Sequence, residues 1–203
     1  MGSSISEALN LVIGTVAGLY IFALLIRFLL QAARVDFYNP ISQSIVKLTA
    51  PLLKPLRRII PGYRGFDFAS LILAMIISIV ACALMILVGE ANISLAAIFS
   101  LSGSIVAWCF VGLLNFILEI YFWGLLISII ASWIAPYSGN PVLLLIHQLL
   151  EPIMRRVHKV IPPMGGLDFS PIFVFLGIQL VEILLVQGLA LSLSLPSQYV
   201  IGI

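Results

Sequence analysis

Three charged side chains lie in stretches of sequence that are otherwise apolar, and they are the first candidates for chemistry. Arg27, Glu119 and Glu182 are each surrounded by aliphatic and aromatic residues, and Asn115 precedes Glu119 by one helical turn. A charge at the centre of a bilayer costs about 2.5–3.5 kcal/mol on insertion scales, so each is a functional candidate. The carboxyl groups could be protonated, pair with Arg27 or bind a coupling cation. Arg27 could instead extend its side chain to the nearby membrane surface.

No other combination of residues indicates catalysis. The sequence contains no nucleophile–base motif, no phosphate-binding loop and no zinc motif. Its histidines, His147 and His158, are not spaced as a metal pair on one helical face, and Cys82 and Cys109 stand in apolar runs as inert buried thiols would. We therefore expect no catalytic residue, no metal and no cofactor.

The composition identifies the solvent that surrounds these residues. Of the 203 residues, 62% are hydrophobic and 9% are charged, with a mean hydropathy of +1.22, whereas a soluble domain carries about 25% charged residues. This excludes a soluble enzyme, a disordered tail and a nucleic-acid-binding domain with a basic face. Four apolar runs, at about 8–33, 70–89, 109–134 and 170–192, exceed the roughly 18 residues that span a bilayer. They predict an all-α membrane protein with about four transmembrane helices.

The chain contains an internal repeat. A shift of 101 residues places Asn39-Pro40 on Asn140-Pro141 and Asp67-Phe68 on Asp168-Phe169 without a gap. The repeat predicts two tandem units, residues 1–92 and 109–203. Residues 93–108 are then a connector, expected to contain a short interfacial helix, although one long helix through residue 135 is the alternative.

Small residues of the first unit align with polar residues of the second. Gly14 and Gly18 lie one turn apart in the first span, and the shift places Asn115 and Glu119 on them. Small residues at this spacing let a neighbouring helix approach closely. We therefore expect the third span to pack its polar residues into the groove formed by the two glycines.

Nearly all the cations lie in two loops, one in each repeat. The residues in question are Lys47, Lys54, Arg57, Arg58 and Arg64, with Arg34, in the first loop, and Arg155, Arg156 and Lys159 in the second. The positive-inside rule predicts that both loops are cytoplasmic and that both termini lie on the opposite side. Each unit crosses twice, so the repeats are parallel rather than inverted.

Each basic loop also carries a helical pattern. Asn39 and Asn140 are expected to cap helices that start at Pro40 and Pro141. Apolar residues then recur at three- and four-residue spacing, and internal prolines predict kinks. This pattern predicts amphipathic helices in the plane of the lipid headgroups, which could recognise anionic lipid or an acidic partner. Alternatively, the cations only set topology, or the segment is re-entrant and lines a pore.

A turn motif closes each loop before the next span. The motifs are IPGYRGFDF at 60–68 and IPPMGGLDF at 161–169. Their glycines permit a positive φ, and their aspartates are expected to cap the following span. The motif residues are Pro61, Gly65 and Asp67 in the first repeat and Pro162, Gly166 and Asp168 in the second.

The stretches PLLKPLRRIIPGYRGFDFASLI and EPIMRRVHKVIPPMGGLDFSPIF resemble the YggT family of small bacterial inner-membrane proteins, as two tandem units that cover nearly the whole chain. The second unit has the typical Asp-Phe-Ser-Pro ending at Asp168–Pro171, whereas the first departs from it at Ala69-Ser70. This departure suggests that the two loops need not have the same function.

The resemblance implies a non-enzymatic, multi-pass protein of the bacterial inner membrane. It implies support of osmotic-stress tolerance, with cation (potassium) uptake as one route. The alternative is a membrane scaffold or assembly factor for a cell-division or cytochrome complex, acting through the cytoplasmic loops. The expected partners are a bilayer with anionic headgroups and a homo-oligomer or membrane protein complex, and no nucleic acid.

Overall fold

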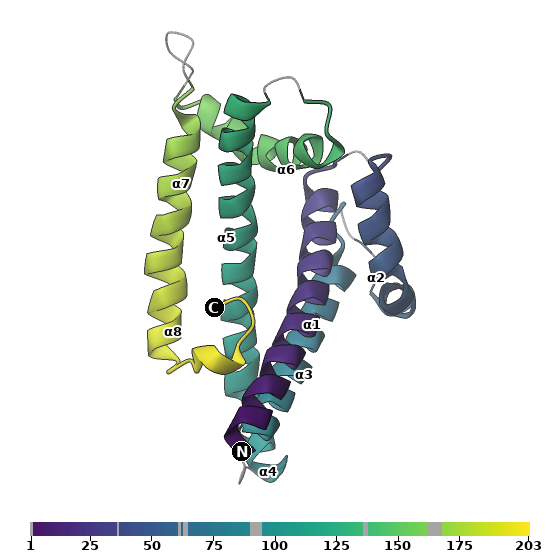
Figure 1. Cartoon of the computed structure of the whole chain (residues 1–203), viewed down its shortest axis with the longest axis vertical. Coiled ribbons are helices and arrows are strands. Elements are labelled where there is room, and N and C mark those ends of the chain that lie inside the picture. Colours follow the sequence, from purple (N-terminus) through teal and green to yellow (C-terminus); the bar gives the residue numbers. More distant parts are fainter. Residues whose placement is uncertain are drawn as a thin grey trace.

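A computed structural model of the protein describes residues 2–35, 37–60, 62, 65–89, 95–135, 138–161 and 168–203. The chain folds into helices, which Figure 1 labels in order. Their bounds are α1 Gly2–Ala32, α2 Pro40–Ile59, α3 Phe68–Gly89, α4 Leu95–Ser100, α5 Ser102–Ile134, α6 Pro141–His158, α7 Ser170–Val181, the π-helical turn η1 Glu182–Gln187, α8 Gly188–Ser192 and the 3-10 turn η2 Ser197–Tyr199.

Within the described residues, four segments are long and apolar enough to cross a bilayer, which confirms the expected all-α class and makes this a multi-pass membrane protein. They are Ser4–Ala32, Phe68–Gly89, Ser102–Ile134 and Ser170–Ser192. The third begins seven residues earlier than the predicted span at 109–134, because the helix already resumes at Ser102 after a break at Leu101. Residues 93–108, expected as a connector, therefore contain the short helix Leu95–Ser100 and also the first residues of α5.

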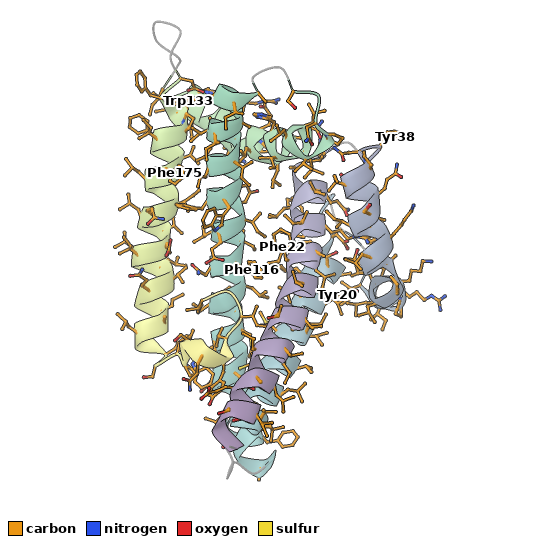
Figure 2. The ribbon with its side chains drawn as sticks, viewed as in Figure 1. Tyr20, Phe22, Tyr38, Phe116, Trp133 and Phe175 are labelled. Carbon is orange, nitrogen blue, oxygen red and sulfur yellow. The ribbon has the colours of Figure 1, made fainter. Side chains whose placement is uncertain are left out.

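The two repeats have the same element order but place their loop helices differently (Figure 1). In the first repeat α1 packs along α3 and α2 runs beside α1, whereas in the second α6 lies across the ends of α5 and α7. The largest buried cluster is centred on α1, where Ile21, Leu24 and Leu25 are fully buried. Phe22 of α1 and Phe116 of α5 stack across the two repeats with ring centroids 6.1 Å apart (Figure 2).

The C-terminal segment, residues 193–203, folds back against the bundle and bonds to α5. Trp108 donates its indole N–H to the carbonyl oxygen of Leu193 (3.0 Å), and the Asn115 side-chain amide donates to the carbonyl oxygen of Gly202 (2.8 Å). Gly112 permits this approach, because a Cβ there would lie 2.5 Å from the carbonyl oxygen of Ile201. The C-terminal segment is thus part of the packed core, and Val200 is 4% exposed.

Candidate functional site

A buried polar cluster joins α1, α2 and the start of α3. Its members, called the Arg27 cluster below, are Arg27, Thr49, Arg57, Asp67 and Ser70. Arg27 donates from Nη1 to Thr49 Oγ1 (2.5 Å) and to the carbonyl oxygen of Val46 (3.1 Å), and its Nε lies 3.5 Å from Asp67 Oδ2. Arg27 is 6% exposed, so it does not extend to the membrane surface as one reading of the sequence had it.

Asp67 is the centre of this cluster and is 1% exposed. Arg57 forms a two-pronged ion pair with it, in which Nε lies 3.3 Å from Oδ1 and Nη2 meets Oδ2. The Ser70 hydroxyl donates to Oδ2 at 2.6 Å. Burial alone would raise the pKa of Asp67, but the hydrogen bonds from Arg57 and Ser70 outweigh it and hold the pKa below its ordinary value. Asp67 therefore stays ionised at neutral pH and fastens three elements together.

This chemistry suits anchoring better than proton transfer. A guanidinium does not deprotonate in proteins, and an aspartate between two guanidinium groups keeps its charge. Breaking such a buried pair by removing one partner leaves an uncompensated charge. The Arg27 cluster therefore fixes the position of α2 relative to the spans.

The second repeat has a more exposed counterpart of the Arg57–Asp67 contact. His158 and Asp168 align with Arg57 and Asp67 under the 101-residue shift, and His158 Nε2 lies 2.9 Å from Asp168 Oδ2. Both side chains are more than a third exposed. Burial would raise the pKa of Asp168, but hydrogen bonds from His158 and Ser170 hold it below its ordinary value.

The second repeat has no arginine at the place of Arg27. Ser128 aligns with Arg27, and its hydroxyl lies 3.3 Å from His147 Nδ1. The aspartate of the second repeat caps its span, because Asp168 Oδ1 accepts from the backbone N–H of Ser170 at 2.9 Å. Asp67, for which the sequence suggested capping, instead receives the Ser70 hydroxyl and the arginines.

The apolar stripe that the three- and four-residue spacing predicts on α2 is divided between two sides: Ile41, Ile45 and Leu56 pack against the core. Ser42, Thr49 and Leu53 face the bundle and are buried. Leu48 and Leu52, which belong to the predicted stripe, are 57% and 51% exposed. Thr49 faces inward, where its hydroxyl oxygen accepts from Arg27, and Leu48 and Leu52 therefore lie on another side of the helix.

The intramembrane carboxyl groups lie away from Arg27. Glu119 is exposed on α5, and Glu182 begins η1 and accepts from the Gln179 amide at 3.4 Å. The elements that carry them, α5 and η1, pack against each other. Among the described residues neither carboxyl group forms an ion pair with Arg27, whose charge partner is Asp67.

The groove beside Gly14 and Gly18 has a different occupant from the one expected. A Cβ on Gly14 would lie 3.6 Å from Met85 Sδ of α3, and one on Gly18 would lie 3.5 Å from Ile201 Cγ2. Asn115 reaches the carbonyl oxygen of Gly202 instead of the groove. The C-terminal segment thus lies where the third span was expected, because its small and apolar residues fit between the helices.

The two loop helices meet at their first residues. Asn39 and Asn140 cap α2 and α6, since each side-chain oxygen accepts from a backbone N–H two residues later at 2.9 Å. Asn39 also donates its amide to the carbonyl oxygen of Pro141 (2.7 Å), and Pro40 and Pro141 begin the two helices. A single side chain therefore caps α2 and holds it to α6.

The turn motifs are described only in part. Gly65 has φ +88°, a conformation that favours glycine. Pro61, Arg64, Pro162 and Gly166 lie outside the described residues.

The remaining loop cations are exposed. They are Arg34 shortly after α1, Lys47, Lys54 and Arg58 on α2, Arg155 and Arg156 on α6, and Lys159 directly after α6. Arg155 pairs with Glu151 one turn earlier, with Nη2 3.3 Å from Oε1. In Figure 2, nitrogen-tipped side chains extend outward from α2.

Sequence reasoning grouped Arg57 with these surface cations and did not single out Thr49 or Ser70. The sequence feature that could have identified Ser70 as a partner of Asp67 is its position three residues later, which is within capping distance.

Comparison with known proteins agrees with the internal repeat. The CCB3/YggT family model matches residues 6–88 and again residues 107–189. The chain is 40% identical over 190 residues to a protein of Pseudomonas aeruginosa, covering 92% of both chains. It is 36% identical to the protein YggT of Escherichia coli K12, over 84% of this chain and 85% of that protein.

A protein of Vibrio alginolyticus is 37% identical, over 88% of this chain and 94% of the relative. No solved structure matches the chain. Because the family model covers both repeats and these relatives align over most of their length, the chain belongs to the CCB3/YggT family.

Proposed function

We propose that this protein is a non-enzymatic scaffold of the bacterial inner membrane, which holds partner membrane proteins against the outer surfaces of its amphipathic helices α2 and α6. The Arg27 cluster is the observation that supports this proposal. It fastens α2 to α1 and α3 through buried charges, while Lys47, Lys54 and Arg58 point outward. A surface fixed before binding loses less entropy when a partner docks.

The proposed orientation places α2 and α6 in the cytoplasm and both termini on the opposite side. Nine of the ten Lys and Arg residues belong to the two loops that contain these helices, and the positive-inside rule assigns such loops to the cytoplasm. A Ser138→Cys variant tests this with a membrane-impermeant maleimide. We expect no labelling in spheroplasts and full labelling in inverted vesicles; the reverse pattern contradicts the orientation.

In vivo photo-crosslinking tests the scaffold function. A photoreactive residue replaces Leu52 on α2, and the control replaces Leu176, which is 55% exposed on α7. We expect a discrete adduct with another membrane protein from position 52 only, and its loss when Asp67→Asn releases α2. No adduct from position 52, or the same adducts from both positions, contradicts the scaffold.

Support of osmotic-stress tolerance through cation (potassium) uptake is a second candidate. Its supporting observation is that Glu119 and Glu182 lie on two elements that pack against each other, α5 and η1. Single π-helical turns within α-helices are frequent at functional sites, and paired carboxylates are suitable ligands for a hard cation.

Potassium flux into proteoliposomes tests this second candidate. The parent is compared with Glu119→Gln and Glu182→Gln, and a Gln187→Ala variant on the same helical turn serves as the control. Uptake through the pair predicts flux in the parent and the control, and at least a tenfold loss in both Gln variants. Flux no greater than in empty vesicles removes direct uptake.

A further inference from the structure

An apolar groove of about 740 Å³ runs along the α1–α3 pair and reaches α2. Its walls include Val16 and Ala17 of α1 and Ile77 and Val80 of α3, and Leu48 of α2 contributes at one end. Tyr20, labelled in Figure 2, is the one lining residue with a polar side-chain atom. In a membrane, a groove with such walls is filled by hydrocarbon because no polar partner is present for water.

The groove continues onto the exposed flank of α2. Leu48 and Leu52 lie one turn apart on that flank and are half exposed, because Thr49 occupies the side that faces Arg27. The flank therefore extends the apolar surface of the groove from the spans to the loop helix.

A stripe of cations borders this apolar flank. Lys47, Lys54 and Arg58 are seven and then four residues apart, so they share one side of α2, and all three are exposed. By helical periodicity the leucine flank lies between this stripe and the buried side. Within the described part of the chain, none of the three cations forms a salt bridge, whereas Arg57 is committed to Asp67.

We propose that the groove and the cationic stripe form one binding site for an anionic phospholipid. An acyl chain lies between α1 and α3, passes Leu48 and Leu52, and brings the headgroup phosphate to Lys47, Lys54 and Arg58. The charge of the stripe selects an anionic over a zwitterionic headgroup, and the groove selects a membrane lipid over free phosphate. This site shares the outer surface of α2 with the proposed protein-docking surface, but lipid binding does not require the scaffold function.

The α6 end of the second repeat provides a matched control. Arg155 and Lys159 align with Lys54 and Arg58, and Arg156 supplies a third exposed cation. Arg155 is already paired with Glu151. In the first turn of α6, Val142 and Leu144 are the exposed apolar residues. Replacing these three cations with Gln changes the net charge by the same amount without touching the groove.

Native mass spectrometry of the purified full-length chain tests the proposal. The protein is titrated with phosphatidylglycerol and with phosphatidylcholine of identical acyl chains. Each cation is worth roughly fivefold near an anionic surface, so Lys47→Gln/Lys54→Gln/Arg58→Gln is expected to lower phosphatidylglycerol affinity on the order of a hundredfold. The α6 triple variant is expected to change it less than fivefold. Inorganic phosphate is expected not to displace the lipid.

A groove variant separates chain binding from headgroup binding. Ala17→Phe fills the groove and is expected to weaken binding of both lipids about equally, with the melting temperature confirming a folded protein. Equal losses in the two triple variants, no preference for phosphatidylglycerol in the parent, or displacement by phosphate overturns the proposal. A lipid-free dimer that Ala17→Phe abolishes also overturns it, because a second copy then occupies the groove. Leu52 also lies on the proposed path of the acyl chain, but the lipid titration is made on the purified chain without partner proteins, so its outcome is distinguishable from the photo-crosslinking result at position 52.

Discussion

Arg57 and His158 occupy equivalent positions in the two repeats, and each contacts the aspartate that precedes the next span. The two basic side chains are similarly exposed, Arg57 at 39% and His158 at 36%, but Asp67 is 2% exposed and also pairs with Arg27, whereas Asp168 is 38% exposed. The equivalent interaction therefore holds α2 firmly in the first repeat and holds α6 more weakly in the second. The first motif departs from the second at Ala69-Ser70. This departure contributes to the difference between the two contacts, because the Ser70 hydroxyl donates a further hydrogen bond to Asp67.

Removing the Asp67 carboxylate should destabilise the fold far more than removing Asp168. Asp67→Asn leaves Arg27 buried without its charge partner, which costs on the order of 3 kcal/mol. Asp168→Asn removes an exposed pair and should cost less than about 1 kcal/mol. Free energies of unfolding in detergent micelles compare the two, and equal losses would show that Arg27 does not depend on Asp67.

Exchanging Arg57 and His158 between the repeats should exchange the strength of their contacts with Asp67 and Asp168. His158→Arg offers Asp168 a permanently charged, two-pronged partner and should slow proteolytic cleavage between α6 and α7. Arg57→His withdraws one such partner from Asp67 and should speed cleavage between α2 and α3. Limited proteolysis with mass mapping measures both rates. Unchanged rates in both variants would mean that neither contact limits loop opening.

The stability contributed by Asp67 should disappear in acid. Its pKa is lowered in the folded protein, so the contribution is fully present above the ordinary value of 3.8 and is lost as pH falls through the lower folded value. The difference in unfolding free energy between the parent and Asp67→Asn should therefore be constant near neutral pH. It should shrink below about pH 4. A difference that grows in acid would mean that the folded protein prefers the protonated carboxyl group.

Packing of the C-terminal segment should tolerate no side chain at Gly112. Gly112→Ala places a Cβ against the carbonyl oxygen of Ile201 and should cost about 1–3 kcal/mol. Gly103→Ala, on the same helix with nothing within 4 Å of the added Cβ, should be neutral or stabilising by up to about 1 kcal/mol. Thermal unfolding of both variants provides the comparison. A stabilising Gly112→Ala would place the C-terminal segment elsewhere.

The sequence was sufficient for the fold class, the spans and the family, because long apolar runs and the 101-residue repeat are properties of the chain itself. It was not sufficient for the partner of Arg27. Asp67 and Arg57 were both singled out, but one was assigned to capping and the other to the membrane surface. Their meeting depends on how α2 is rotated, and that rotation is set by Thr49 through a hydrogen bond to another helix.

The C-terminal segment illustrates the same limit. Residues 193–203 show no helical or strand periodicity, so nothing local predicts where they lie. Their position follows from a space beside Gly18 and Gly112 and from hydrogen bonds offered by Trp108 and Asn115. Each of these features comes from a different part of the chain and becomes visible only after the helices are packed.

A double-mutant cycle on Arg57 of α2 and Asp67 tests the anchoring of α2 most directly. Arg57→Met, Asp67→Asn and the double variant are compared by free energy of unfolding in the same micelles. We predict that the double variant is more stable than the sum of the single losses implies, by at least about 1 kcal/mol, since Arg57→Met removes a charge partner from buried Asp67 and Asp67→Asn leaves Arg57 without its partner. Strictly additive losses would contradict the claim that this pair fastens α2 to the spans.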